Sequence, residues 1–207
     1  MGWFVPGASP NPPTNESDGG PTGAGDAFLM VVATGISGPG GRLSVLNDSQ
    51  WAGNYLGVTS IRMDVNNFGP SDLYLRLLFE DLEGFGPPVN LALSANAVLV
   101  PANSGWISIE FLISPADLVV ETFGTVEGAL ANTDTLRIFH NPNATFPGPP
   151  TGIPPVNATL GIDNISAVPE PGTILLFAAG ILALFAVFRK NSIRARQSCT
   201  YYGTGVL

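Results

Sequence analysis

IRMDVN, residues 61–66, alternates apolar and polar side chains at every position. Successive side chains of a β-strand point to opposite faces of the sheet, so this alternation predicts a strand with one buried and one solvated face. Looser versions of the pattern occur at residues 73–77 and 106–111. The sequence therefore favours antiparallel sheets with one face in water.

Aliphatic segments separated by Gly, Pro, Asn and Ser recur through the body of the chain. Eight of them read as strands, at residues 27–33, 42–46, 58–66, 72–81, 90–100, 106–113, 135–140 and 158–166. We predict an all-β fold, a jelly-roll-like antiparallel β-sandwich over residues 26–167, with an immunoglobulin-like sandwich as the alternative. Short helical turns are expected at residues 114–118, where Ser114 is an N-cap followed by Pro115, and at residues 126–132.

Composition and charge exclude several classes of protein. One cysteine, Cys199, excludes an intramolecular disulfide framework, and one histidine, His140, excludes a paired-histidine metal site. Residues 1–170 hold four cations and all sixteen acids, a net charge of −12. A body this acidic repels phosphate backbones, so we expect no nucleic-acid partner.

A uniformly apolar run, ILLFAAGILALFAVF, occupies residues 174–188. It is apolar all round and near the short limit of a membrane span, so we predict a transmembrane helix over residues 173–188 in the lipid bilayer. A buried core helix is the alternative. The cations Arg189, Lys190, Arg194 and Arg196 follow the run. Such a cluster stays on the cytoplasmic side, so the acidic body is expected outside the inner membrane.

Pro169-Glu170-Pro171 lies directly before the apolar run. Two prolines keep this segment extended, because each lacks an amide donor and disfavours helical geometry before it. The order of Pro-Glu-Pro, hydrophobic helix and Arg/Lys cluster resembles the PEP-CTERM sorting signal of Gram-negative bacteria. The resemblance covers about residues 168–196, with the signal itself at residues 168–190.

This resemblance implies a substrate of an exosortase, a membrane-embedded cysteine transpeptidase-like enzyme. Such enzymes are thought to cut near Pro-Glu-Pro and to release the body to the cell surface or extracellular matrix. Pro169, Glu170 and Pro171 would be the recognition element, and Arg189, Lys190, Arg194 and Arg196 the membrane stop signal. The chain would be the substrate of the cut and not itself an enzyme.

Both ends of the chain depart from that pattern. Residues 1–25 are rich in Pro and Gly and lack a cationic and apolar leader, so we interpret them as a flexible lead and expect an in-frame leader upstream. Residues 191–207 form a basic tail that continues past the usual end of the signal. They are either a cytoplasmic extension or a frameshifted reading of the gene's end.

The body also carries a weaker resemblance, over about residues 50–166. Leu160-Gly161-Ile162-Asp163-Asn164-Ile165 is similar to the last strand of many carbohydrate-binding jelly rolls. There the aspartate often helps to hold a structural calcium ion, which implies Asp163 as a calcium ligand with Asp26 as its partner. We favour the alternative that Asp163 caps a strand end, and we expect no other cofactor.

Aromatic side chains stack on sugar faces, so exposed ones are candidate glycan contacts. Trp51 and Tyr55 lie in a loop-like segment and are the best candidates, with exopolysaccharide as the partner.

Catalytic groups are scarce in this sequence. His140 is the sole imidazole, and we interpret it as a surface residue at the end of a strand. Glu80, Asp81 and Glu83 would suit a glycosidase, which needs two carboxylates, but a solvated turn is the better interpretation. The main hypothesis is therefore a non-enzymatic exported surface or matrix protein. A carbohydrate-binding module and a small secreted glycosidase are the alternatives.

Overall fold

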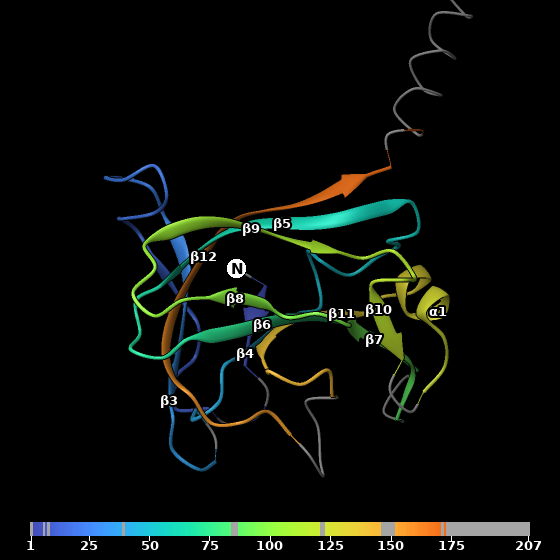
Figure 1. Cartoon of the computed structure of the whole chain (residues 1–207), viewed down its shortest axis with the longest axis horizontal. Coiled ribbons are helices and arrows are strands. Elements are labelled where there is room, and N and C mark those ends of the chain that lie inside the picture. Colours follow the sequence, from blue (N-terminus) through green and yellow to red (C-terminus); the bar gives the residue numbers. More distant parts are fainter. Residues whose placement is uncertain are drawn as a thin grey trace, which may run out of the picture. The chain divides into compact units, whose positions relative to one another are not determined.

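The body of the chain is an antiparallel β-sandwich, which confirms the predicted all-β class (Figure 1). The computed structural model describes residues 2–5, 7, 9–38, 40–83, 87–120, 123–145, 152–170 and 172. The chain divides into two compact units, Met1–Val168 and Pro169–Leu207. Among the described residues, no helix has the length and apolar character needed to cross a membrane. The predicted helix at residues 173–188 lies outside them.

Twelve strands and one short helix lie within the described residues. The strands are β1 (Trp3–Phe4), β2 (Thr14–Glu16), β3 (Phe28–Thr34), β4 (Ser44–Asn47), β5 (Val58–Asn67), β6 (Leu73–Leu82), β7 (Pro88–Ser94), β8 (Val98–Val100), β9 (Trp106–Leu112), β10 (Leu118–Val120), β11 (Thr135–His140) and β12 (Asn157–Pro169). The helix is α1 (Val126–Ala131).

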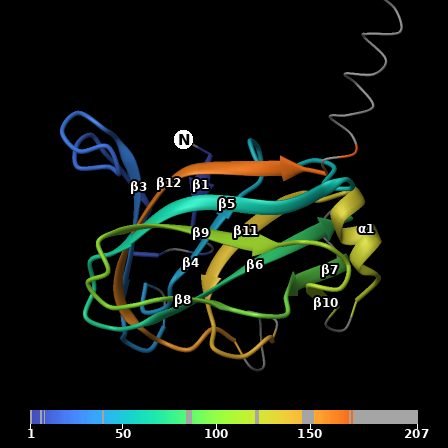
Figure 2. The ribbon, with the colours of Figure 1, turned by 45° about the horizontal axis from the view of Figure 1, so that its top comes forward.

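The strands form two sheets that face each other across the core (Figure 2). Sheet A has the order β1-β4-β11-β6-β7-β10, with β8 also paired to β6. Sheet B has the order β2-β3-β12-β5-β9. Every strand pair with a described register is antiparallel.

The core follows from the alternation in the central strands. In β6, the fully buried residues Leu73, Leu75, Leu77 and Phe79 occupy every second position. In β5, Ile61, Met63 and Val65 do the same, and both sets belong to one hydrophobic cluster. Each such side chain contributes about 1.5 to 3 kcal/mol by leaving water, so these two strands contribute much of the core's stability.

One of the two expected helical turns forms a helix. Helix α1 begins after Thr125, whose hydroxyl accepts the amide hydrogen of Gly128. At residues 114–118 the expected short helix is only a single turn, which Asp117 N–H closes by donating to Ser114 O. Strand β10 starts at Leu118 and pairs with β7. Its valines suit an extended backbone, and strand pairing therefore outweighs the helix start signal.

Two other expectations about the strands need correction. The segment at residues 90–100 is two strands, β7 and β8, rather than one. The N-terminal lead, expected to be flexible, contains two short strands: β1 pairs with β4 and β2 pairs with β3. They extend one edge of each sheet.

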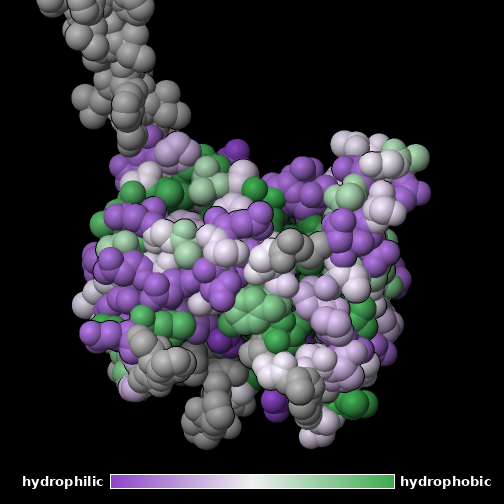
Figure 3. Space-filling model, turned by 180° about the vertical axis from the view of Figure 1, so that it is seen from behind, coloured by the Kyte–Doolittle hydropathy of each residue, from purple (hydrophilic) through white to green (hydrophobic). Residues whose placement is uncertain are grey.

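The outer face of sheet A is closed. A second hydrophobic cluster covers it, formed by Leu78, Leu91, Leu93, Phe139 and Ile153. Elsewhere the surface mixes residue types: in the view from behind, hydrophobic residues lie in small groups among hydrophilic ones (Figure 3). A candidate binding surface is therefore sought on sheet B.

Candidate functional site

The outer face of sheet B carries polar side chains from three neighbouring strands, β5, β9 and β12. They border a hollow of about 480 Å³, which we call the sheet-face groove. Its lining is Arg62, Met63, Asp64, Ser108, Ile109, Glu110, Asn164 and Ser166. The alternation at residues 61–66 places Arg62 and Asp64 on this face, opposite the buried residues of β5.

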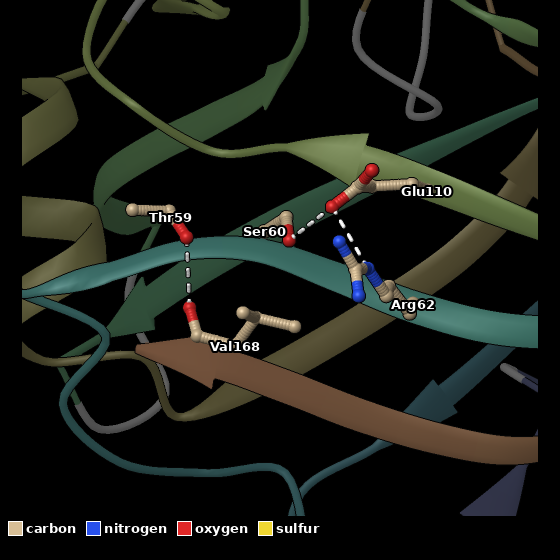
Figure 4. Close-up of polar contacts among 5 residues, drawn as sticks. All are labelled: Thr59, Ser60, Arg62, Glu110 and Val168. Carbon is tan, nitrogen blue, oxygen red and sulfur yellow. Dashed lines mark hydrogen bonds and ion pairs between the residues drawn. The ribbon is translucent and has the colours of Figure 1, made fainter. Parts of the chain in front are cut away.

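An ion pair crosses the groove from β5 to β9 (Figure 4). Arg62 Nε donates to Glu110 Oε1 at 3.0 Å, and Ser60 Oγ donates to the same oxygen at 2.6 Å. These hydrogen bonds, that from Ser60 first, hold the pKa of Glu110 below its ordinary value. Glu110 is therefore an exposed, ionised acceptor, and it does not suit a general acid.

A second carboxylate in the groove is bound from both sides. Asp64 accepts hydrogen bonds from Ser108 Oγ of β9 and from Asn164 Nδ2 of β12, the latter at 2.8 Å. Asn164 has a φ of +50°, a left-handed backbone that asparagine tolerates better than most residues. The polar side chains of the groove are thus held in place by hydrogen bonds to one another.

An aromatic cluster occupies another part of this face, over Gly161 of β12. A Cβ atom at Gly161 would lie 2.9 Å from the Trp106 ring and 3.0 Å from the Phe68 ring, so only glycine fits beneath them. Trp106 packs edge-on against Phe28 at 5.2 Å between ring centroids, and its indole N–H donates to Gly19 O. The cluster is therefore largely structural, although Phe68 is 43% exposed.

The two predicted glycan contacts lie in different surroundings. Tyr55 was expected to be exposed, but it is buried; its hydroxyl donates to Trp51 O at 2.7 Å and its ring packs on Phe79. Burial also raises the pKa of Tyr55. Trp51 is half-buried and borders a second hollow of about 300 Å³, which we call the tryptophan notch. Its lining includes Trp3, Asn15, Gln50, Trp51, Asp163 and Asn164.

The acidic residues 80–83 were expected in a solvated turn, and the first of them, Glu80, is not solvated. Glu80 lies in β6, is 5% exposed and pairs with Arg137 at 2.6 Å. Burial raises the pKa of Glu80, and the adjacent guanidinium opposes that shift. Because the pair is enclosed, Glu80 has no access to a substrate. Asp81 is half-buried and accepts from Asn90 Nδ2, and only Glu83 is exposed.

His140 was expected on the surface at a strand end, and the structure buries it at the end of β11. Its Nδ1 accepts the backbone N–H of Tyr74 at 3.0 Å. Burial lowers the pKa of His140, so the imidazole is neutral near pH 7. The His140 side chain therefore links the end of β11 to the backbone of β6.

The two predicted calcium ligands, Asp26 and Asp163, make different contacts. Asp26 Oδ2 accepts the N–H of Thr22 at 2.8 Å and closes its own loop, while Asp163 borders the tryptophan notch. In the part of the chain that the structure describes, no three His, Cys, Asp or Glu side chains gather into a metal-binding group. Calcium takes six to eight oxygen ligands, which can also be carbonyl and amide oxygens, so a calcium ion at Asp163 stays a prediction.

The predicted sorting segment begins within the last strand. Pro169 ends β12 and Glu170 is exposed. One residue earlier, Val168 O accepts a hydrogen bond from Thr59 Oγ1 at 3.0 Å, which fastens the end of β12 to β5 (Figure 4). Pro171, Arg189, Lys190, Arg194 and Arg196 lie outside the described residues.

Sequence reasoning missed Trp3, Glu110 and Asn164. Trp3 was hidden in a segment expected to be flexible. Glu110 was visible as a polar position in an alternating strand, but its bond to Arg62 depends on pairing across 48 residues. No short pattern in the sequence predicts the left-handed backbone conformation of Asn164.

Comparison with known proteins adds two findings. The PEP-CTERM protein-sorting motif matches residues 167–190, which confirms the predicted signal. No curated protein sequence matches the chain.

Solved structures share the fold of the body at low sequence identity. The family 11 carbohydrate-binding module from Clostridium thermocellum, in complex with a β-1,3-1,4-mixed-linked tetrasaccharide, has a TM-score of 0.50 at 14% identity, over 82% of this chain and 90% of that chain. The solution structure of the same module, CtCBM11, has a TM-score of 0.51 at 13% identity, over the same shares of the two chains. An exo-β-agarase has a TM-score of 0.51 at 12% identity, over 83% of this chain and 23% of that chain. The body therefore has the sandwich fold of carbohydrate-binding modules.

Proposed function

We propose that this chain is an exported, non-enzymatic surface or exopolysaccharide-matrix protein that an exosortase processes. The motif match at residues 167–190 is the observation that carries the proposal. In this scheme the apolar run holds the body at the inner membrane with the C-terminus in the cytoplasm. Cutting near Pro169, Glu170 and Pro171 then releases the body to the cell surface or the medium.

Two features of the body support a non-enzymatic role. Two of the residues that could have served as acid or base, Glu80 and His140, are buried within the sandwich. The exposed carboxylate of the groove, Glu110, is held ionised by its partners. The proposed role needs no cofactor, and a structural calcium ion at Asp163 stays a prediction.

The mature C-terminus tests the sorting proposal. Mass spectrometry of the membrane, surface and secreted fractions should find a chain ending near Pro169 to Gly172. Glu170→Ala should leave most of the protein intact in the membrane fraction, whereas Ser166→Ala, an exposed position four residues earlier, should be processed normally. An unprocessed wild-type chain ending at Leu207 would contradict the proposal.

We propose polysaccharide binding as a second candidate function. Two observations favour it: the sandwich fold shared with the family 11 module, and the open groove of fixed polar groups. The full chain in detergent should bind on an array of neutral glycans. Glu110→Gln together with Ser108→Ala should weaken that binding, while Thr14→Ala on exposed β2 should not. Absence of binding to every glycan would reject this second function and leave the sorting proposal unaffected.

A further inference from the structure

We propose that the tryptophan notch binds a pyranose ring of a neutral polysaccharide, at a site that adjoins the sheet-face groove and shares Asn164 with it. The inference rests on the second candidate function and extends it with a second set of contacts. The notch lies where β12 continues past the start of β3, since their pairing ends at Leu29 and Ile162. It holds about 300 Å³.

Two indole side chains from distant segments meet in this notch. Trp3 comes from β1 and Trp51 from the loop after β4, and both are half-buried. A partly exposed indole offers a flat apolar face on which the C–H groups of a sugar ring can stack. Two of them beside one hollow can hold a single ring more tightly than one can.

The loop that carries Trp51 is fixed from beneath. Asn47 is fully buried and lies opposite Trp3 in the β1–β4 pair. Its Oδ1 accepts the backbone N–H of Trp51 at 3.0 Å and the backbone N–H of Ser49 at 3.1 Å. The Tyr55 hydroxyl holds the carbonyl of Trp51. Both backbone polar groups of Trp51 are therefore bonded, so the loop backbone that carries the indole does not have to be ordered when a ligand packs on it.

The indole N–H groups provide a second argument. The N–H of Trp106 is used within the fold, by Gly19 O. Within the described ranges, the indole N–H groups of Trp3 and Trp51 show no acceptor. Both rings are half-buried, so these N–H groups could donate to a sugar hydroxyl without giving up a bond within the described part of the fold.

The remaining groups set the class of ligand. Asn15, Gln50 and Asn164 are exposed amides, which both donate to and accept from hydroxyl groups. Asp163 is the one charged side chain among the lining residues and adds only acceptors. With the acidic body around it, this carboxylate repels uronate, sulfate and phosphate groups. The notch therefore suits an uncharged sugar.

The test measures the affinity of full-length protein in detergent for neutral tetrasaccharides of defined linkage, including the β-1,3-1,4-mixed-linked form, by calorimetry. Trp51→Ala and Trp3→Ala should each weaken binding by about tenfold, and Trp51→Phe, which keeps a ring, by about threefold. Asp163→Asn preserves shape, so it should still bind neutral sugars and should also bind an oligouronate more tightly than the wild type does.

Control variants separate the two sites. Glu110→Gln changes the groove. It should lower the affinity for the glycan by the same factor in the wild type and in the Trp51→Ala variant. Thermal unfolding should show that Trp51→Phe and Asp163→Asn remain folded. If the wild type binds a glycan and none of the notch variants changes its affinity, the inference is overturned while glycan binding stands. If the wild type binds none of the panel, the second function and this inference both fail, and the processed C-terminus still decides the sorting proposal.

Discussion

The outer faces of the two sheets use the same pair of side chains in opposite ways. On sheet A, Glu80 and Arg137 form an ion pair whose side chains are 6% and 12% exposed. On sheet B, Glu110 and Arg62 form one whose side chains are 40% and 59% exposed. The first pair lies on the face that a hydrophobic cluster covers, and the second borders an open groove.

This difference separates side chains that hold the fold together from side chains that water can reach. A buried charge must satisfy its hydrogen bonds within the protein, so removal of one partner is costly. An exposed ion pair contributes little to stability because water and salt screen it. The ion pair on the open face of sheet B is therefore expected to add little to stability, whereas the one on the closed face of sheet A helps to hold the chain in place.

The largest effect is expected at Arg76, on the closed face. Its guanidinium donates to four carbonyls, those of Asn141, Ser94, Ala95 and Pro142, at 2.6 to 3.0 Å. It thereby fastens residues 141 and 142 to β6 and to the end of β7. Arg76→Met should lower the free energy of unfolding by about 3 to 5 kcal/mol, because several buried carbonyls lose their donor. Urea denaturation measures this, and a loss below about 1 kcal/mol would show that water replaces the guanidinium.

An intermediate effect is expected from His140, which is buried at the end of β11. Burial lowers its pKa in the folded state, so the unfolded state binds more protons at mildly acidic pH. Stability should therefore fall as pH drops below about 6.5, with a slope of at most about 1.4 kcal/mol per pH unit. His140→Gln keeps an acceptor for Tyr74 N–H and should remove this slope. Urea denaturation of both proteins at pH 7.5 and 5.5 measures the difference, and equal losses would contradict the assignment.

Much of the fold was predictable because its signals are local. Alternation at residues 61–66 and 73–77 marks the central strands, and Thr125 sits at the start of α1. The closed and open faces could not be told apart in this way. In the sequence, Arg76 and Glu80 resemble solvated positions of a strand. Asn141, which binds Arg76, lies 65 residues away, and Arg137, which pairs with Glu80, lies 57 residues away. Tyr55 was misjudged for the same reason, because its loop packs on Phe79 of another strand.

The candidate site was predictable only in part. Trp51 was expected at a surface, and it borders a hollow. Its neighbours in that hollow, Trp3 and Asp163, come from the two ends of the body and meet only through sheet pairing. Pairing partners across such distances depend on the whole hydrophobic pattern rather than on any short motif.

The smallest effect on stability is expected on the open face. Arg62→Met is the same substitution as Arg76→Met, in a strand of the same kind, yet it should change the free energy of unfolding by less than about 1 kcal/mol. A double-mutant cycle with Glu110→Gln measures the coupling of the pair, which should shrink further in 1 M salt, where charges are screened beyond about 3 Å. A loss close to that of Arg76→Met would mean that the open face belongs to the framework. In that case the Arg62–Glu110 pair would stabilise the fold, and its side chains could not turn toward a ligand without a loss of stability. The proposal that the groove is a binding surface would then be contradicted.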